Sequence, residues 1–198
     1  MAEVRAVRPD ELAEAAALLG RVFDTEAMVA WTLPADSDLA SVSERFFGAF
    51  HRAAEPDGWV WVVGDGRVEG MAMWVPPDPH DRYAEVLAAI DDEVAELAGV
   101  LKSRYDTFWE WVEAHRPPQP HWYLEHIAVD AEARGRGLGR ALIEHGLNSA
   151  DAGGAASWLA TSKPRNVPMY ERFGFEVGSA GDAPEGGPHV WFMARDPR

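Results

Sequence analysis

The stretch VDAEARGRGLGRAL, residues 129–142, decides the fold because it places a glycine-rich, basic turn between a strand and a helix. Residues 122–129 are apolar and extended, whereas Leu138, Ala141, Leu142 and His145 recur at the spacing of one helix face. The glycines therefore lie where a helix begins, and the first amide N–H groups of a helix have no partner within it. The sequence predicts a site for a pyrophosphate at this helix N-terminus.

The glycines and arginines of this turn have complementary uses. Glycine lets the backbone approach an anion closely and adopt positive φ, and arginine supplies charge-assisted donors. The residues concerned are Gly135, Gly137 and Gly139 with Arg134, Arg136 and Arg140. The spacing alone also fits a plain loop with solvated arginines. A Walker loop would end in Gly-Lys followed by Ser or Thr, and a Rossmann fingerprint would open an early βαβ unit, so both fit less well.

Two motifs carry a resemblance to a known family. The pattern RxxGxG at 134–139, after the strand end Ile127-Ala128-Val129, resembles the acetyl-CoA pyrophosphate loop of the GNAT superfamily of N-acetyltransferases. NVPMYERFGF at 166–175 is similar to that family's later motif, in which an asparagine contacts the cofactor and a tyrosine lies near its sulfur. Within the family, residues 115–117, 161–172 and 184–193 are most similar to the puromycin N-acetyltransferases.

The resemblance implies acetyl-CoA as the cofactor and assigns its contacts. The implied cofactor-binding residues are Ile127, Ala128, Val129, Arg134, Gly135, Arg136, Gly137, Leu138, Gly139, Arg140, Asn166 and Tyr170. A backbone N–H near Ile127 or Val129 would polarise the thioester carbonyl. Tyr170 would also be catalytic, because its hydroxyl would protonate or hydrogen-bond the sulfur as it leaves. General acids of this kind contribute about 10²-fold to 10⁴-fold in rate.

A base near the acceptor is expected, because an amine is largely protonated at neutral pH. Glu125 and His126 are adjacent on the strand before the loop. Side chains alternate across an unbulged strand, so only one of the two would face the acceptor. We favour Glu125, which shares a face with Tyr123, and related acetyltransferases place bases at these two positions. The puromycin enzymes carry small or neutral residues at both the Glu125 and His126 positions, so a structural carboxylate, His126 or solvent stays an alternative.

Composition narrows the reaction and the partners. The absence of cysteine excludes a cysteinyl acyl-enzyme and favours direct transfer, and no His-x-x-x-His pair occurs, so we expect no metal site. A net charge of −15 argues against nucleic acid and suits a small-molecule amine as partner. We expect no membrane span and a cytoplasmic protein, and a homodimer is compatible with the sequence. A non-catalytic acyl-CoA-binding module, or an acetylase of a protein or aminoacyl-tRNA amine, are the alternatives.

The order of predicted elements gives the fold class. Strands are expected at 4–7, 59–63, 68–75, 121–129, 156–160, 175–178 and 189–194, with helices at 10–22, 28–32, 39–53, 81–114, 137–152 and 166–173. This order predicts an α/β (α+β mixed) fold, with a central sheet of about seven strands and helices on both faces. The chain would form one domain, residues 1–198, with a helical insertion at 80–115 near the acceptor. The resemblance implies that strands 122–129 and 157–160 splay apart around the pantetheine arm.

Overall fold

The computed structural model describes residues 3–23, 26–33, 38–77 and 81–198. A seven-stranded sheet in the order β1-β2-β3-β4-β5-β7-β6 forms its centre, and only the β4–β5 pair is parallel. The strands are β1 Arg5–Ala6, β2 Val60–Val63, β3 Gly70–Val75, β4 His121–Val129, β5 Ala156–Thr161, β6 Glu176–Asp182 and β7 His189–Arg195. The predicted mixed sheet is confirmed.

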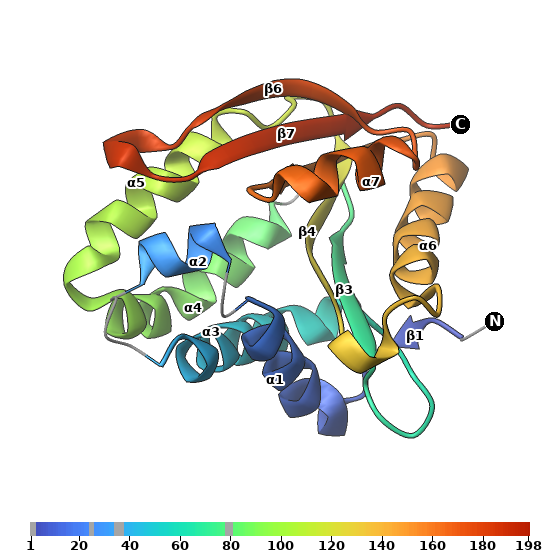
Figure 1. The fold of residues 1–198 in the computed structure, drawn as a ribbon, viewed down its shortest axis with the longest axis horizontal. Helices are drawn as coiled ribbons and strands as arrows, with labels where there is room; N and C mark the ends of the chain where they lie inside the picture. The colour runs from blue at the N-terminus through green and yellow to red at the C-terminus, as the bar shows by residue number, and fades with distance from the viewer. Residues whose placement is uncertain (1–2, 24–25, 34–37, 78–80) are drawn as a thin grey trace.

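Helices cover both faces of the sheet, as expected (Figure 1). One face carries α1 Leu12–Phe23, α2 Ala27–Thr32, α3 Leu39–Ala54, α4 Arg82–Ala98 and α5 Lys102–Glu113. The other face carries α6 Leu138–Ala152 and α7 Val167–Glu171. Each face therefore has its own apolar core, and the strand residues alternate between the two cores. No helix among the residues described reaches the length and apolar character that a membrane span requires.

A hairpin joins β2 and β3, and glycine is required in its turn. Gly64 has φ of 152°, and a Cβ there would lie 2.0 Å from the Arg67 carbonyl oxygen. Gly66 has φ of 75°, in the left-handed region that glycine favours. After the turn, β3 runs antiparallel to β4 and pairs with it.

Strands β4 and β5 separate after three register pairs. His121, Trp122 and Tyr123 pair with residues 156–158, and beyond these positions β4 pairs with no other described strand on that side. The predicted splay is confirmed. The glycine-rich loop follows β4, and α6 begins at the open end of the gap (Figure 1). The gap thus joins the loop to the middle of the sheet.

A β-bulge in β4 changes the predicted alternation. Met73 pairs with His126 and Trp74 with Leu124, so Glu125 is an extra residue in the strand. Bulges of this kind re-aim the side chains that follow them. Tyr123 and His126 consequently lie on the same face, against α3 and α4. The prediction that only one of Glu125 and His126 would face the acceptor assumed an unbulged strand, and the bulge shows that this assumption does not hold.

The predicted helical insertion forms two helices, α4 and α5. The first helix ends just before Gly99, which has φ of 53°. A single 3-10 turn, Gly99–Leu101, joins the two helices. Residue 80, the first of the predicted insertion, lies outside the described residues. Other boundaries differ modestly from expectation. The first strand has two residues. The last helix, predicted at 166–173, spans Val167–Glu171 and follows a 3-10 turn, Pro164–Asn166. Strand β6 extends to Asp182 by pairing with β7.

Candidate active site

A cavity of about 420 Å³ occupies the gap between β4 and β5. The start of α6, α7 and the 3-10 turn before α7 close it on one side, and α1 and Glu26 close it on the other. Of the residues implied by the resemblance, the cavity is lined by Ile127, Ala128, Val129, Arg134, Gly139, Asn166 and Tyr170. The structure therefore brings together, around one space, motifs that lie in separate parts of the chain.

The glycine-rich loop presents backbone to this cavity. Gly135 and Gly137 have φ of 77° and 82°, and Gly137 is the N-cap residue of α6. The first helical hydrogen bond runs from Ala141 N–H to the Gly137 carbonyl at 3.0 Å, so the preceding N–H groups of the first turn lack a helical acceptor. A Cβ on Gly139 would lie 3.4 Å from Val129, so the glycine keeps strand and helix close. Unpaired N–H groups at a helix start suit a phosphate.

The three loop arginines have different surroundings. Arg134 lines the cavity and makes no ion pair with any residue that the structure describes. Arg136 Nη1 lies 2.8 Å from Glu69 Oε1, and this hydrogen bond lowers the pKa of the Glu69 carboxyl. Arg140 Nε lies 2.9 Å from Glu144 Oε1 on the outside of α6. Of the three side chains, only that of Arg134 faces the space where a pyrophosphate would lie.

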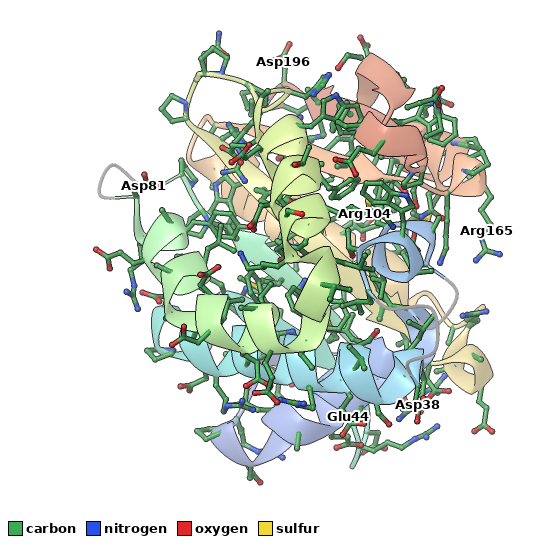
Figure 2. All side chains as sticks on the ribbon, turned by 90° about the vertical axis from the view of Figure 1, so that its left-hand side faces the viewer. Asp38, Glu44, Asp81, Arg104, Arg165 and Asp196 are labelled. Atoms are coloured by element: carbon green, nitrogen blue, oxygen red, sulfur yellow. The ribbon has the colours of Figure 1, made fainter. Side chains whose placement is uncertain are left out.

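The remaining implied residues of the loop lie beside the cavity but do not line it. Leu138 is buried in the core under α6, so only its backbone N–H is available to a ligand. Gly135 and Gly137 shape the turn, and a Cβ on either would meet nothing within 4 Å. Two basic residues that the sequence analysis did not assign do line the cavity, Lys163 and Arg165. Arg165 is exposed and projects at the edge of the molecule (Figure 2). Their signal in the sequence was basic character directly before the asparagine motif.

Tyr170 stands in the wall of this cavity. Its side chain is buried, and its hydroxyl makes no hydrogen bond to any of the described residues. Burial raises the pKa of the phenol, and the charge of Glu26 raises it further. The hydroxyl therefore stays protonated at neutral pH and is available as a donor. Asn166 Nδ2 donates to Thr161 Oγ1 at 3.1 Å, which orders the start of the same motif.

The free edge of β4 supplies two further donors. Asp130 N–H donates to the Glu69 carbonyl at 2.9 Å, toward β3. Because N–H directions alternate along an antiparallel strand, those of Ile127 and Val129 point away from β3. They point into the gap, where β4 has no paired strand beside it.

A second cavity, of about 720 Å³, lies under α4 and α5 on the opposite side of Glu125. Its walls are aromatic and acidic. The rings come from Phe46, Phe50, Tyr83, Tyr105, Trp109 and Tyr123, and the carboxylates from Asp81, Asp91, Asp106, Glu110, Glu113 and Glu125. Figure 2 looks onto α4 and α5, the two helices that cover this cavity. Trp109 Nε1 is buried without a hydrogen-bond partner among the described residues and is free to donate to a ligand.

Charges around the second cavity are only partly neutralised. Lys102 Nζ lies 3.0 Å from Asp91 and 2.6 Å from Asp106, and Arg116 pairs with Glu113 at 3.1 Å. Glu110 makes no ion pair with any residue that the structure describes. The field of the cavity is therefore negative, which favours a cationic guest.

Glu125 lines both cavities. Its side chain is about 10% exposed, and its carboxylate is hydrogen-bonded to Nδ1 of His126. The pKa values of the Tyr83 and Tyr123 phenols are raised chiefly by burial and next by the charge of Glu125. Both phenols are therefore neutral, and the carboxylate is the charged group where the cavities meet.

Sequence analysis did not identify His51. His126 Nε2 lies 2.8 Å from Nε2 of His51, which is fully buried on α3. Glu125, His126 and His51 thus form a continuous chain of side chains from the cavity junction into the core. No sequence signal indicates this contact, because His51 belongs to a helix 75 positions away from its partner. Among the residues described, no group of three or more His, Asp or Glu side chains is arranged to hold a metal ion.

Comparison with known proteins identifies the family. A model of the acetyltransferase (GNAT) family matches residues 25–175. The chain belongs to this family. An uncharacterized N-acetyltransferase of Schizosaccharomyces pombe is 41% identical over 129 residues, covering 60% of this chain and 51% of that protein. Escherichia coli YhbS, also an uncharacterized N-acetyltransferase, is 33% identical over 99 residues, covering 48% of this chain and 52% of YhbS. The chain thus spans about half the length of these curated relatives.

Solved structures show the same fold. An acetyltransferase from Corynebacterium glutamicum, described as related to histone acetyltransferase HPA2, superposes with a TM-score of 0.73 at 21% identity, covering 100% of this chain and 97% of that one. A polyamine N-acetyltransferase of Drosophila melanogaster gives 0.60 at 16% identity, covering 99% of this chain and 100% of that one. At these identities the likeness establishes the GNAT fold.

Proposed function

We propose that this protein transfers the acetyl group of acetyl-CoA directly to a primary amine of a small molecule. One observation carries the proposal: Glu125 lines both the cavity beside the glycine-rich loop and the aromatic, acidic cavity. A carboxylate at such a junction can receive the proton that an amine loses as it attacks a carbonyl carbon. The two cavities then hold the two substrates.

The residues around the first cavity fit acetyl-CoA. Backbone N–H groups at the start of α6 and the side chain of Arg134 would hold the pyrophosphate, and the open edge of β4 would run beside the pantetheine arm. Acetyl-CoA supplies an activated acyl group on a thiol leaving group. Ile127 and Val129 would donate backbone N–H groups to the thioester oxygen as negative charge develops there.

Two side chains would handle the protons of the reaction. Glu125 would take the proton from the attacking nitrogen, and Tyr170 would donate its hydroxyl proton or a hydrogen bond to the departing sulfur. The burial that keeps Tyr170 protonated supports this division of roles. Transfer in a single complex, without an acyl-enzyme, agrees with a chain that has no cysteine.

The acceptor cavity favours a cation with an apolar or aromatic body. Carboxylates attract the ammonium group, and the faces of Tyr83, Tyr105 and Trp109 offer cation–π and stacking contacts. Solved structures with this fold include proteins described as a polyamine N-acetyltransferase, an agmatine N-acetyltransferase and an arylalkylamine N-acetyltransferase-like protein, which agrees with such a guest. Aminonucleosides are a further candidate class, from the sequence similarity to the puromycin enzymes. The net charge of −15 disfavours aminoacyl-tRNA.

A panel of amines tests this function. Polyamines, arylalkylamines, aminonucleosides, aminoglycosides and amino acids are incubated with acetyl-CoA, and the released thiol is measured. We expect turnover of cationic amines that carry an apolar or aromatic body. Binding of acetyl-CoA by calorimetry, without turnover of any amine, would instead identify a non-catalytic acyl-CoA-binding module.

A further inference from the structure

We propose that His51 is a positioning residue that holds His126 as the neutral tautomer with its proton on Nδ1, so that the amine's proton is taken by Glu125. The inference rests on the proposed function, because it specifies which atom acts as the base. It concerns the buried chain Glu125–His126–His51, in which His126 is the middle member.

The hydrogen bonds define the tautomers. The Glu125 carboxylate is an acceptor, so His126 Nδ1 carries the proton that it donates. In a neutral imidazole the other nitrogen is then an acceptor. His126 Nε2 therefore accepts, and the donor at 2.8 Å is the Nε2–H of His51.

The surroundings of the other ring nitrogen of His51 support this assignment. Its Nδ1 is buried and has no hydrogen-bond partner among the described residues. With the proton on Nε2, the nitrogen without a partner, Nδ1, is unprotonated and carries only a lone pair. The opposite tautomer would place an N–H there, and a buried N–H without an acceptor is the costlier and rarer of the two situations.

This tautomer decides which group accepts a proton. A proton on Glu125 Oε1 leaves the chain intact, because Oε2 still accepts from His126 Nδ1–H. A proton on His126 Nε2 would face the N–H of His51 across 2.8 Å. His51 would then have to move its own proton to the orphan nitrogen. The step that remains breaks the amine N–H bond, forms an O–H bond on Glu125 and leaves both histidines neutral.

The surroundings keep His51 neutral. Burial lowers its pKa well below the usual value, and positive charge on His126 or on Arg52, its neighbour in α3, would lower it further. Rings of Phe47 and Phe50 pack against His126. Among the titratable groups around Glu125, the phenols of Tyr83 on α4, Tyr105 on α5 and Tyr123 on β4 have pKa values raised first by burial and are neutral. Glu110, Glu113 and Arg116 line the same cavity as Glu125, and Glu26 and Lys163 line the other. The Arg116 and Lys163 cations are paired with Glu113 and Glu26.

Nitrogen-15 NMR of the histidine side chains tests the tautomer in the wild-type protein, without any acceptor amine. We expect the His126 signals of a ring with a protonated Nδ1 and an unprotonated Nε2. The exposed ring of His189 serves as an internal reference. A His126 signal with a protonated Nε2 would overturn the assignment. The His51 signals are assigned by their loss in His51→Gln, and the His126 signals by their loss in His126→Gln.

A pair of variants tests the consequence for catalysis. His51→Leu removes the donor, so His126 becomes free to take a proton. The acid limb of the pH profile of kcat/KM should then move upward by about one to two pH units, from carboxyl toward imidazole behaviour. His51→Gln keeps an N–H donor and should retain the wild-type limb. A merely structural role predicts parallel profiles for wild type and a folded His51→Leu, and that result would overturn the proposal.

The two readouts separate this inference from the proposed function. An amine panel without turnover would overturn the function and leave the NMR assignment unaffected. An inverted His126 tautomer in an active enzyme would overturn the role of His51 alone. If His51→Leu does not fold, the wild-type spectra and the His51→Gln profile still decide the question.

Discussion

The indole ring of Trp74 lies directly against the backbone of Gly146, so close that a Cβ there would lie 2.1 Å from Cε2 of the ring. Trp74 Nε1 also donates to the Leu142 carbonyl of the same helix at 3.2 Å. These contacts clamp α6 onto β3. The helix whose N-terminus would hold the phosphate is thereby fixed against the sheet.

Gly146→Ala should therefore destabilise the protein. Alanine normally stabilises a helix relative to glycine by about 0.5–1 kcal/mol, but overpacking a filled contact costs about 1–3 kcal/mol. We expect a net loss of unfolding free energy, measured by urea titration. Gly153→Ala is the matched control, because a Cβ there meets only ordinary contacts, the nearest at 3.5 Å. A stabilised Gly146→Ala would contradict the close packing.

Gly137→Val should abolish the binding of acetyl-CoA while most of the fold remains. The residue has φ of 82° at the first turn of α6, where a β-branched side chain is strained and would stand between backbone and phosphate. Gly58→Val is the control, since Gly58 has φ of 70° with equally open surroundings but lies far from the loop in sequence. Calorimetry should show lost binding only for Gly137→Val. Unchanged affinity would remove the loop from the cofactor site.

Tyr170→Phe should lower kcat by about 10²-fold to 10⁴-fold with little change in the affinity for acetyl-CoA. The hydroxyl is needed only as the sulfur leaves, whereas the ring that packs on Phe175 is kept. Steady-state kinetics with a cognate amine and calorimetry with acetyl-CoA provide the two numbers. Equal turnover by wild type and variant would exclude Tyr170 from proton donation.

Glu125→Gln should reduce kcat/KM by about 10²-fold or more at neutral pH, and the loss should shrink at high pH, where free amine is abundant. Glu110→Gln is the control, because it removes a carboxylate that lines the second cavity but not the first. It should raise KM and leave the shape of the pH profile unchanged. A parallel profile for Glu125→Gln with a lowered melting temperature would indicate a structural carboxylate.

Glu11 should make stability depend on acid pH. Both Nη atoms of Arg5 lie 2.6 Å from its carboxylate, and these bonds, with the Arg8 N–H at 3.0 Å, lower its pKa from 4.5 to about 2. A lowered pKa stabilises the fold above pH 4.5, and this contribution is lost as the pH falls toward 2.

Glu11→Gln should therefore cost about 2 kcal/mol at pH 7. The difference from wild type should narrow below pH 4.5 and vanish near pH 2. Urea unfolding over this pH range measures the effect, with the exposed Asp10→Asn as control. A difference that stays constant with pH would show that the ion pair contributes nothing.

Local features of the chain were predictable from sequence. The strand, glycine turn and helix at 122–152 follow from hydrophobic period and from the positive φ that only glycine adopts readily, both properties of neighbouring residues. The Gly64–Gly66 hairpin and the break at Gly99 are explained in the same way. These signals need no knowledge of tertiary contacts.

Features set by long-range packing were not predictable. The bulge at Glu125 arises from the register with Met73 and Trp74, and no glycine or proline in β4 announces it. Arg136 resembles Arg134 in sequence, and only Glu69, 67 positions away, turns it from the cavity. The contact between His51 and His126 depends on how α3 packs on β4. Contacts between residues so far apart in sequence cannot be predicted from the identity of either residue.

The short pairing of β4 with β5 divides the sheet into two mechanical blocks, β1–β4 and β5–β7–β6, joined at three positions. Each block contributes one wall of the gap. A molecule that fills the gap would contact both β4 and β5 where the two strands do not pair with each other, and it would thereby couple the two blocks. Amide hydrogen exchange along the free edge of β4 should therefore slow on binding, and the two blocks should unfold together only when the gap is filled.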